Sequence, residues 1–234
     1  MEYIKENLER IKTEIAKICD KHKRSTSEIT LIAVSKTFPA DCISAAYAYG
    51  HRVFGENRPQ ALRDRFVEIK EENISWHLIG SLQKNKIKYV VGKTALIHSV
   101  DSVETAIGID DYCRKHALSQ EILIEVNTSG ELSKMGISPG QLPEILEKTR
   151  YCRHIRIMGL MTMAPLTTHA KTIKNCFAML RSLRDTYQKT LPTLTHLSMG
   201  MSNDYALALE EGATLLRIGT AIFGNRPEAK AFHA

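Results

Sequence analysis

The chain has 234 residues, of which 43% are hydrophobic and 25% are charged, and its formal net charge is +6 at pH 7. This composition supplies enough apolar material for one large α/β domain and argues against a disordered chain. We find no run of 18 or more apolar residues, and the first residues carry charges of both signs. We therefore expect neither export nor membrane anchoring, and a cytoplasmic location.

The cysteines and basic residues indicate no special class of partner. The five cysteines are scattered and in no CxxC spacing, which argues against a disulfide framework and a structural zinc site. They are Cys19, Cys42, Cys113, Cys152 and Cys176. The densest basic cluster is formed by Lys84, Lys86, Lys88 and Lys93, which we interpret as a solvated helix face. We therefore expect no nucleic-acid partner.

Periodicity predicts an opening helix followed by eight strands. Apolar residues recur at helical spacing from Ile4 to Ile18, so we expect a helix over residues 2–22, within an N-terminal element 1–24 that packs on the rest. The β-rich runs that follow are 29–34, 52–55, 75–79, 95–100, 122–126, 155–161, 195–199 and 214–218. Each of the first seven is followed by a stretch of helical character, for example 40–49, 58–72, 103–116, 139–150, 169–190 and 203–211.

This alternation predicts a (β/α)8 TIM barrel. No linker or shift in composition divides the chain, so we expect residues 1–234 to form one barrel domain. The length is close to the roughly 250 residues typical of this fold. An open doubly wound sheet is the alternative, but no G-x-G-x-x-G motif follows the first strand.

The chemistry of such a barrel gathers at the carboxyl ends of its strands, and Lys36 follows the first strand. Partial burial and neighbouring positive charge lower the pKa of a lysine and make its neutral, nucleophilic amine available for a Schiff base. A lysine that ends a strand and extends to solvent is an equally ordinary structural feature. Lys36 alone therefore does not settle the chemistry.

Two strand ends form a matched pair that predicts a phosphate site. Residues 198–204 follow the seventh strand and residues 217–220 include the end of the eighth, where barrels commonly hold phosphate. Small residues there let backbone N–H groups approach an anion, and we expect Ser202 or Asn203 to cap a helix starting near Asp204. A lysine across from a phosphate site fits pyridoxal 5′-phosphate (PLP), and it also fits a phosphosugar bound by an aldolase-type lysine.

Other residues near strand ends allow more than one interpretation. His77 is either a satisfied interior histidine or a residue that lines the ligand. Asn57 precedes Arg58 and Pro59, which predicts a helix cap and is compatible with cofactor contact. We expect the methionines near strand ends to fill the interior, and no HExxH or Asp-rich loop indicates a metal site.

Five segments together resemble the pyridoxal phosphate homeostasis proteins, the YggS/PROSC family. They are 33–36 (AVSK), 54–57 (FGEN), 76–86 (WHLIGSLQKNK), 198–202 (SMGMS) and 217–224 (RIGTAIFG). Residues 127–136 are also similar, although Leu132 stands where a polar residue is often expected. The resemblance implies a fold-type III PLP barrel like the N-terminal domain of alanine racemase.

The same resemblance implies a set of cofactor-binding residues. Lys36 would form the Schiff base, Asn57 would lie beside the cofactor, and Arg217 would face the pyridine nitrogen. The phosphate would be held by Met201, Ser202, Gly219 and Thr220. To these we add His77, Ser198 and Gly200 as residues of the same segments.

Arg217 favours a PLP carrier over an enzyme. Its permanent charge disfavours protonation of the pyridine nitrogen, which weakens the cofactor as an electron sink. A racemase also needs a second base, and Tyr205, near the expected start of a helix, gives no reason to place it over a substrate. We therefore expect a monomeric protein of intracellular PLP homeostasis with little or no turnover, whose partners include PLP-dependent apo-enzymes. A PLP-dependent amino-acid racemase is the alternative.

Overall fold

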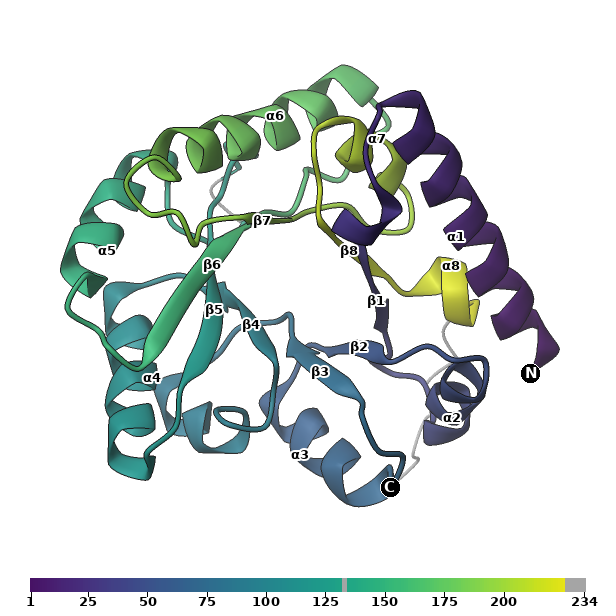
Figure 1. Ribbon diagram of the computed structural model, residues 1–234, viewed down its shortest axis with the longest axis horizontal. Coiled ribbons are helices and arrows are strands. Elements are labelled where there is room, and N and C mark those ends of the chain that lie inside the picture. Colours follow the sequence, from purple (N-terminus) through teal and green to yellow (C-terminus); the bar gives the residue numbers. More distant parts are fainter. Residues whose placement is uncertain (132–133, 226–234) are drawn as a thin grey trace, which may run out of the picture.

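The computed structural model describes residues 1–131 and 134–225, which fold into a closed barrel of parallel strands in the order β1 to β8. Figure 1 shows the strands as a ring with the helices outside it. The strands are β1 (Thr30–Val34), β2 (Val53–Glu56), β3 (Ser75–Leu78), β4 (Leu96–Val100), β5 (Gln120–Glu125), β6 (Ile155–Met161), β7 (His196–Ser198) and β8 (Leu215–Ile218). The predicted (β/α)8 barrel is confirmed.

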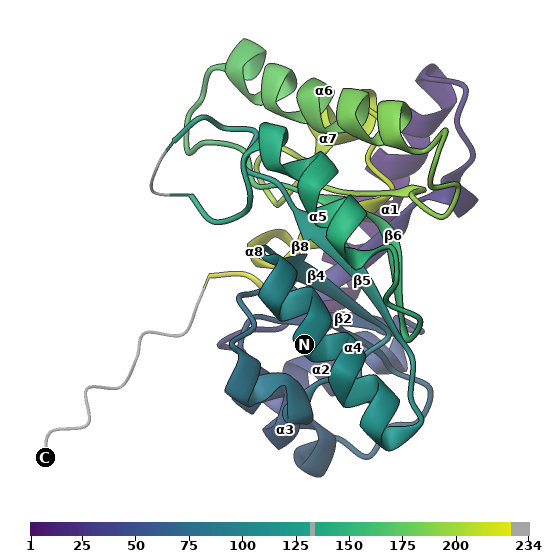
Figure 2. The same cartoon turned by 90° about the vertical axis from the view of Figure 1, so that its left-hand side faces the viewer.

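The α-helices agree with the periodicity of the sequence. They are α1 (Glu2–Lys21), α2 (Ala40–Ala48), α3 (Pro59–Glu68), α4 (Val103–His116), α5 (Leu142–Thr149), α6 (Ala170–Tyr187), α7 (Tyr205–Glu210) and α8 (Thr220–Phe223). Three 3-10 helices accompany them, namely η1 (Thr26–Glu28), η2 (Lys84–Tyr89) and η3 (Pro139–Gln141). The side view in Figure 2 shows α6 and the α3–α4 pair on opposite sides of the strands. Among the described helices, none is long and apolar enough to cross a membrane.

The helical stretch after β3 differs in type from the others. A stretch of helical character was expected after each of the first seven strands, and after β3 it is the six-residue 3-10 helix η2. The basic cluster at residues 84–93 is therefore not an α-helical face. The ring of Tyr89 lies among these cations, with Lys86 Nζ 5.7 Å and Lys88 Nζ 5.3 Å from its centroid.

The barrel interior is packed with large apolar side chains. Ile32, Leu96, Leu123, Met161 and Leu215 form a buried cluster contributed by five different strands. Close approach of β6 and β7 requires a glycine, because a Cβ on Gly159 would lie 2.1 Å from the carbonyl oxygen of His196. The interior is therefore a packed core, and a ligand site has to lie at one end of it.

The predicted N-terminal helix is present as α1. Its buried face consists of Ile4, Leu8, Ile11, Ile15 and Cys19. α1 packs mainly against α2, α7 and α8, so the first helix of the chain lies beside its last two (Figure 1). α1 therefore packs against the helices that follow β7 and β8.

Candidate functional site

A cavity of about 410 Å³ opens among the loops that follow several strands. This volume is within the range of roughly 300–1,000 Å³ usual for small-molecule sites. The wall comes from segments after β1, β2, β3, β6, β7 and β8, together with Lys134. Its residues are Val34, Lys36, Phe38, Asn57, Ile79, Lys134, Met163, Ala164, Pro165, Leu166, Thr167, Ile173, Met201, Ser202, Asn203, Asp204, Arg217, Gly219 and Thr220.

Lys36 lies half-buried in the wall of this cavity, two residues after β1. The residue before it, Ser35, is fully buried and its hydroxyl donates a 2.8 Å hydrogen bond to the Glu56 carboxylate. Arg65 on α3 donates to the same carboxylate at 3.2 Å and to the carbonyl oxygen of Phe38. Hydrogen bonds thus hold the segment 35–38 both before and after Lys36, and they fix the backbone position of this lysine.

Residues of two further loops also line the cavity. Ser202 and Asn203 follow β7, and Thr220 begins α8 after β8. The Ala221 N–H donates to the Ser202 hydroxyl at 3.2 Å and thereby joins the two loops. Within the described part of the chain, the backbone N–H groups of Ser202, Asn203 and Thr220 have no protein acceptor. These donors are therefore free to bind an anionic ligand group.

The turn after β7 is shaped by glycine and by Asp204. Gly200 has φ +93°, and a Cβ there would lie 2.6 Å from the Cβ of Ala208. The buried Asp204 carboxylate accepts the N–H of Met201, so this amide does not face a ligand. The expected cap by Ser202 or Asn203 is wrong, since α7 begins at Tyr205 after Asp204 and no side chain caps it. The side chain of Asp204 is used by the backbone N–H of Met201, and this hydrogen bond fixes the turn before α7.

Asn57 also does not act as the predicted helix cap. α3 begins at Pro59, and its N-cap residue is Arg58, which makes no side-chain cap bond. Asn57 instead lines the cavity. Its backbone is packed against Gly80, where an added Cβ would lie 2.3 Å from the Asn57 carbonyl oxygen.

Arg217 on β8 connects the cavity to a polar network in the barrel interior. Its guanidinium is buried and donates to the Ser198 hydroxyl and, at 2.9 Å, to the Thr162 carbonyl oxygen. The Ser198 oxygen lies 2.8 Å from Nδ1 of His98, whose Nε2 lies 2.9 Å from Nδ1 of His77. Ser198 and His98 therefore help to fix the guanidinium at the base of the cavity.

Burial controls the charges in this network. It lowers the pKa of His77 to about 4 and that of His98 well below its ordinary value, so both rings are neutral near pH 7. Burial lowers the pKa of Arg217 to about 10, partly offset by Glu125 and Asp204, and leaves the guanidinium charged at neutral pH. It raises the pKa of Glu125 to about 7 despite Arg217. Arg217 is thus the permanent cation of the barrel interior.

The structure brings most, but not all, of the predicted site residues into one cavity. Its wall includes Lys36, Asn57, Met201, Ser202, Arg217, Gly219 and Thr220. His77, Ser198 and Gly200 lie outside this wall. His77 and Ser198 belong to the network below Arg217, and the Gly200 carbonyl accepts the Arg217 N–H at 3.0 Å.

Several residues of the site were missed from the sequence. Lys134 adds a second amine to the wall and pairs with Glu131 at 3.7 Å. The segment 163–167 covers another part, and Leu166 in it is 94% exposed. Leu132, noted for its departure from the family pattern, lies outside the described residues. His98 on β4 was also missed. Its sequence signal was a polar residue inside a largely apolar strand.

The described side chains form no cluster of three or more His, Cys, Asp or Glu residues that would hold a metal ion. All five cysteines are free thiols. The charged side chains of the described cavity wall are two amines, one guanidinium and one carboxylate, so cations outnumber anions there.

Comparison with known families matches almost the whole chain. The family model described as "Alanine racemase, N-terminal domain" matches residues 6–227. A pyridoxal phosphate homeostasis protein of Aquifex aeolicus is 41% identical over 222 residues, which cover 94% of this chain and 97% of that protein. The similarity therefore extends over both the barrel and the cavity.

Two solved structures share the fold. PipY of Synechococcus elongatus, solved with PLP bound, has a TM-score of 0.79 and 36% identity and covers 90% of this chain and 100% of that one. An alanine racemase of Clostridium difficile has a TM-score of 0.76 at 12% identity, covering 99% of this chain and 62% of the racemase chain. At that identity, the racemase supports the barrel fold alone.

Proposed function

From the premise that this chain belongs to the family of pyridoxal phosphate homeostasis proteins, we propose that it binds PLP in the cavity described above and serves intracellular PLP homeostasis. One observation carries the proposal. A half-buried lysine, Lys36, shares one cavity with backbone amides that have no protein acceptor among the described residues. These are the two groups that an aldehyde bearing a phosphate requires.

Each part of the cavity has a proposed role toward PLP. Lys36 holds the aldehyde carbon as a Schiff base, and Asn57 lies beside the ring. The N–H groups of Ser202 and Thr220 would bind the phosphate, with Gly219 beside them in the wall, while Met201 supports that loop because Asp204 engages its amide. His77, Ser198 and Gly200 act on the cofactor indirectly, through the position of Arg217.

We propose that the protein carries PLP with little or no turnover. PLP supplies an electron sink when its pyridine nitrogen is protonated. Arg217 is charged at neutral pH, and if it faces that nitrogen it would disfavour this protonation. Tyr205, the tyrosine considered as a second base, is turned away from the cavity, because its hydroxyl donates to Glu14 on α1. These observations favour a carrier over an amino-acid racemase.

The proposal extends to the setting of the protein. We propose one barrel domain over residues 1–234, a monomer that transfers PLP to PLP-dependent apo-enzymes, and a cytoplasmic location. The five free thiols support a reducing compartment.

Borohydride reduction of the PLP-loaded protein, followed by peptide mapping, tests the site. We expect the reduced adduct on Lys36. Lys134→Ala is the matched control, since Lys134 is the other lysine of the described cavity wall and its loss should leave the adduct in place. An adduct on another lysine in wild type, or full trapping on the same peptide in Lys36→Ala, would contradict the assignment.

Turnover is tested separately from binding. The loaded protein is incubated with L- and D-alanine in deuterated water, and in parallel with a PLP-dependent apo-enzyme. We expect reactivation of the apo-enzyme and little exchange of the α-hydrogen. Turnover of roughly 1 to 10³ per second, which is ordinary for enzymes, would favour the racemase.

A further inference from the structure

The N-terminal helix α1 binds the carbonyl end of α8. Asn7 Nδ2 donates to the Ile222 carbonyl oxygen at 3.0 Å, and Arg10 Nη2 donates to that of Ala221 at 3.4 Å. The Tyr3 hydroxyl donates to the Phe223 carbonyl oxygen at 3.4 Å. Three successive carbonyl groups of α8 are thus bound by side chains of one helix.

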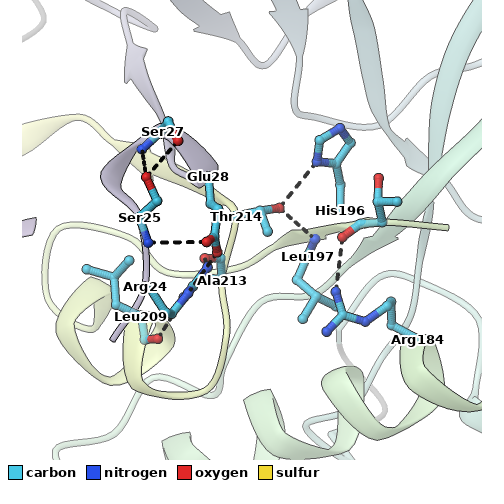
Figure 3. A network of polar contacts seen from close by, with 11 residues as sticks. Arg24, Ser25, Ser27, Glu28, Arg184, His196, Leu197, Leu209, Ala213 and Thr214 are labelled. Atoms are coloured by element: carbon cyan, nitrogen blue, oxygen red, sulfur yellow. Dashed lines mark hydrogen bonds and ion pairs between the residues drawn. The ribbon is translucent and has the colours of Figure 1, made fainter. Parts of the chain in front are cut away.

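The same N-terminal region also binds both ends of α7. Glu14 on α1 accepts the Tyr205 hydroxyl at the start of α7. Figure 3 shows Arg24, just after α1, donating to the carbonyl oxygens of Leu209 at 3.0 Å and Ala213 at 2.8 Å. α1 and Arg24 therefore span the helices that follow β7 and β8.

These contacts matter because α8 is only one turn long. It consists of Thr220 to Phe223 and ends at Gly224, whose φ is +84°. The last carbonyl groups of any helix lack intrahelical partners, and a single turn is not stable in isolation. The opposite end of this turn is Thr220, a residue of the cavity wall whose N–H has no protein acceptor among the described residues. A shift at the carbonyl end of α8 therefore moves a cavity wall.

We propose that α1 is a positioning element for the anion-binding end of the cavity, acting through the hydrogen bonds of Asn7 and Arg10 to α8. That the anion is the phosphate of PLP rests on the proposed function. None of the α1 residues lines the cavity, so their effect on the ligand is indirect. The inference assigns to α1 a role in ligand selectivity beyond covering the barrel.

Asn7→Asp is the sharpest test, because it keeps the size of the side chain and replaces the donor to Ile222 with an acceptor. Arg10→Ala removes the neighbouring donor. Lys12→Met is the matched control on the same helix, since Lys12 lies 4.8 Å from the ring centroid of Tyr49 and faces α2 instead. Thermal unfolding of each variant reports its overall stability.

The first readout is amide hydrogen exchange of residues 219–224 in the cofactor-free protein. We expect Asn7→Asp and Arg10→Ala to accelerate it about two- to tenfold, the range for loss of one hydrogen bond, and Lys12→Met to leave it unchanged. The second readout is the ratio of the Kd for pyridoxal to the Kd for PLP. We expect this ratio to fall by a similar factor, with the affinity for pyridoxal retained.

Unchanged exchange in α8, or faster exchange with an unchanged affinity ratio, would overturn the positioning role. A merely structural role would lower both affinities together and leave their ratio constant. If wild-type protein does not prefer PLP to pyridoxal, the proposed phosphate site is wrong. The exchange measurement on the cofactor-free protein then still decides whether α1 holds α8.

Discussion

Glu125, at the end of β5, is expected to make the protein less stable as the pH rises. The residue is 3% exposed, and burial raises the pKa of its carboxyl group from 4.5 to about 7. The folded state therefore binds a proton more tightly than the unfolded state does. Below pH 4.5 the group is protonated in both states, and between pH 4.5 and 7 stability is lost as the pH rises.

The size of the effect follows from the shift. A rise of the pKa from 4.5 to about 7 corresponds to about 3 kcal/mol, most of which falls between pH 5 and pH 8. Glu125→Gln imitates the protonated acid and removes this loss. The stability of the variant relative to wild type should therefore rise by about 2 to 3 kcal/mol over that interval.

Urea denaturation of the cofactor-free proteins at pH 5, 6, 7 and 8 measures this difference. Comparison with wild type cancels the opposite pH dependence of the buried histidines, which both proteins share. Glu121→Gln, on the same strand but 41% exposed and paired with Arg156, shows the effect of removing one negative charge from β5. Parallel stability curves for Glu125→Gln and wild type would refute the reasoning.

Two further predictions concern the cavity. Gly80→Ala places a Cβ 2.3 Å from the Asn57 carbonyl oxygen, so we expect about 1 to 3 kcal/mol of destabilisation in urea and weaker PLP binding; wild-type values for both would contradict this packing. Ser198→Ala leaves a buried guanidinium N–H of Arg217 without its acceptor, so we expect a loss of about 1.5 to 3 kcal/mol, measured the same way. A neutral result would show that another group takes over this bond.

Strand and helix periods predicted the barrel because each β-rich run is bounded by turn residues and followed by an amphipathic stretch. The bounds of β6 and α4 were predicted to the residue. After β3 the helical stretch is the 3-10 helix η2, which spans only the six residues Lys84–Tyr89. A lysine-rich stretch of that length does not distinguish an α-helix from a 3-10 turn.

The partner of an inward-pointing side chain was harder to predict from the sequence than the face of the strand on which it lies. Alternation along β3 shows that His77 points inward, but not that its partner is His98 on the next strand rather than a ligand. The Met201 amide was missed in the same way, since its bond to Asp204 depends on the turn after β7. The position of Lys36 was easier to predict, because residues that follow the strands of a barrel lie at its carboxyl end.

The packing of α1 has a consequence for the order in which the molecule folds. Asn7 and Ile222 are 215 positions apart, so α1 leaves the ribosome long before its partner α8 has been made. α2 becomes available early, but α7 and α8 do not. Until α7 and α8 have been made, part of the apolar face of α1 has no native partner and is exposed to chaperones and to other chains. Docking of α1 can therefore be completed only after the segments that close the barrel are present, which adds contacts of long sequence separation to a fold otherwise rich in local βα contacts.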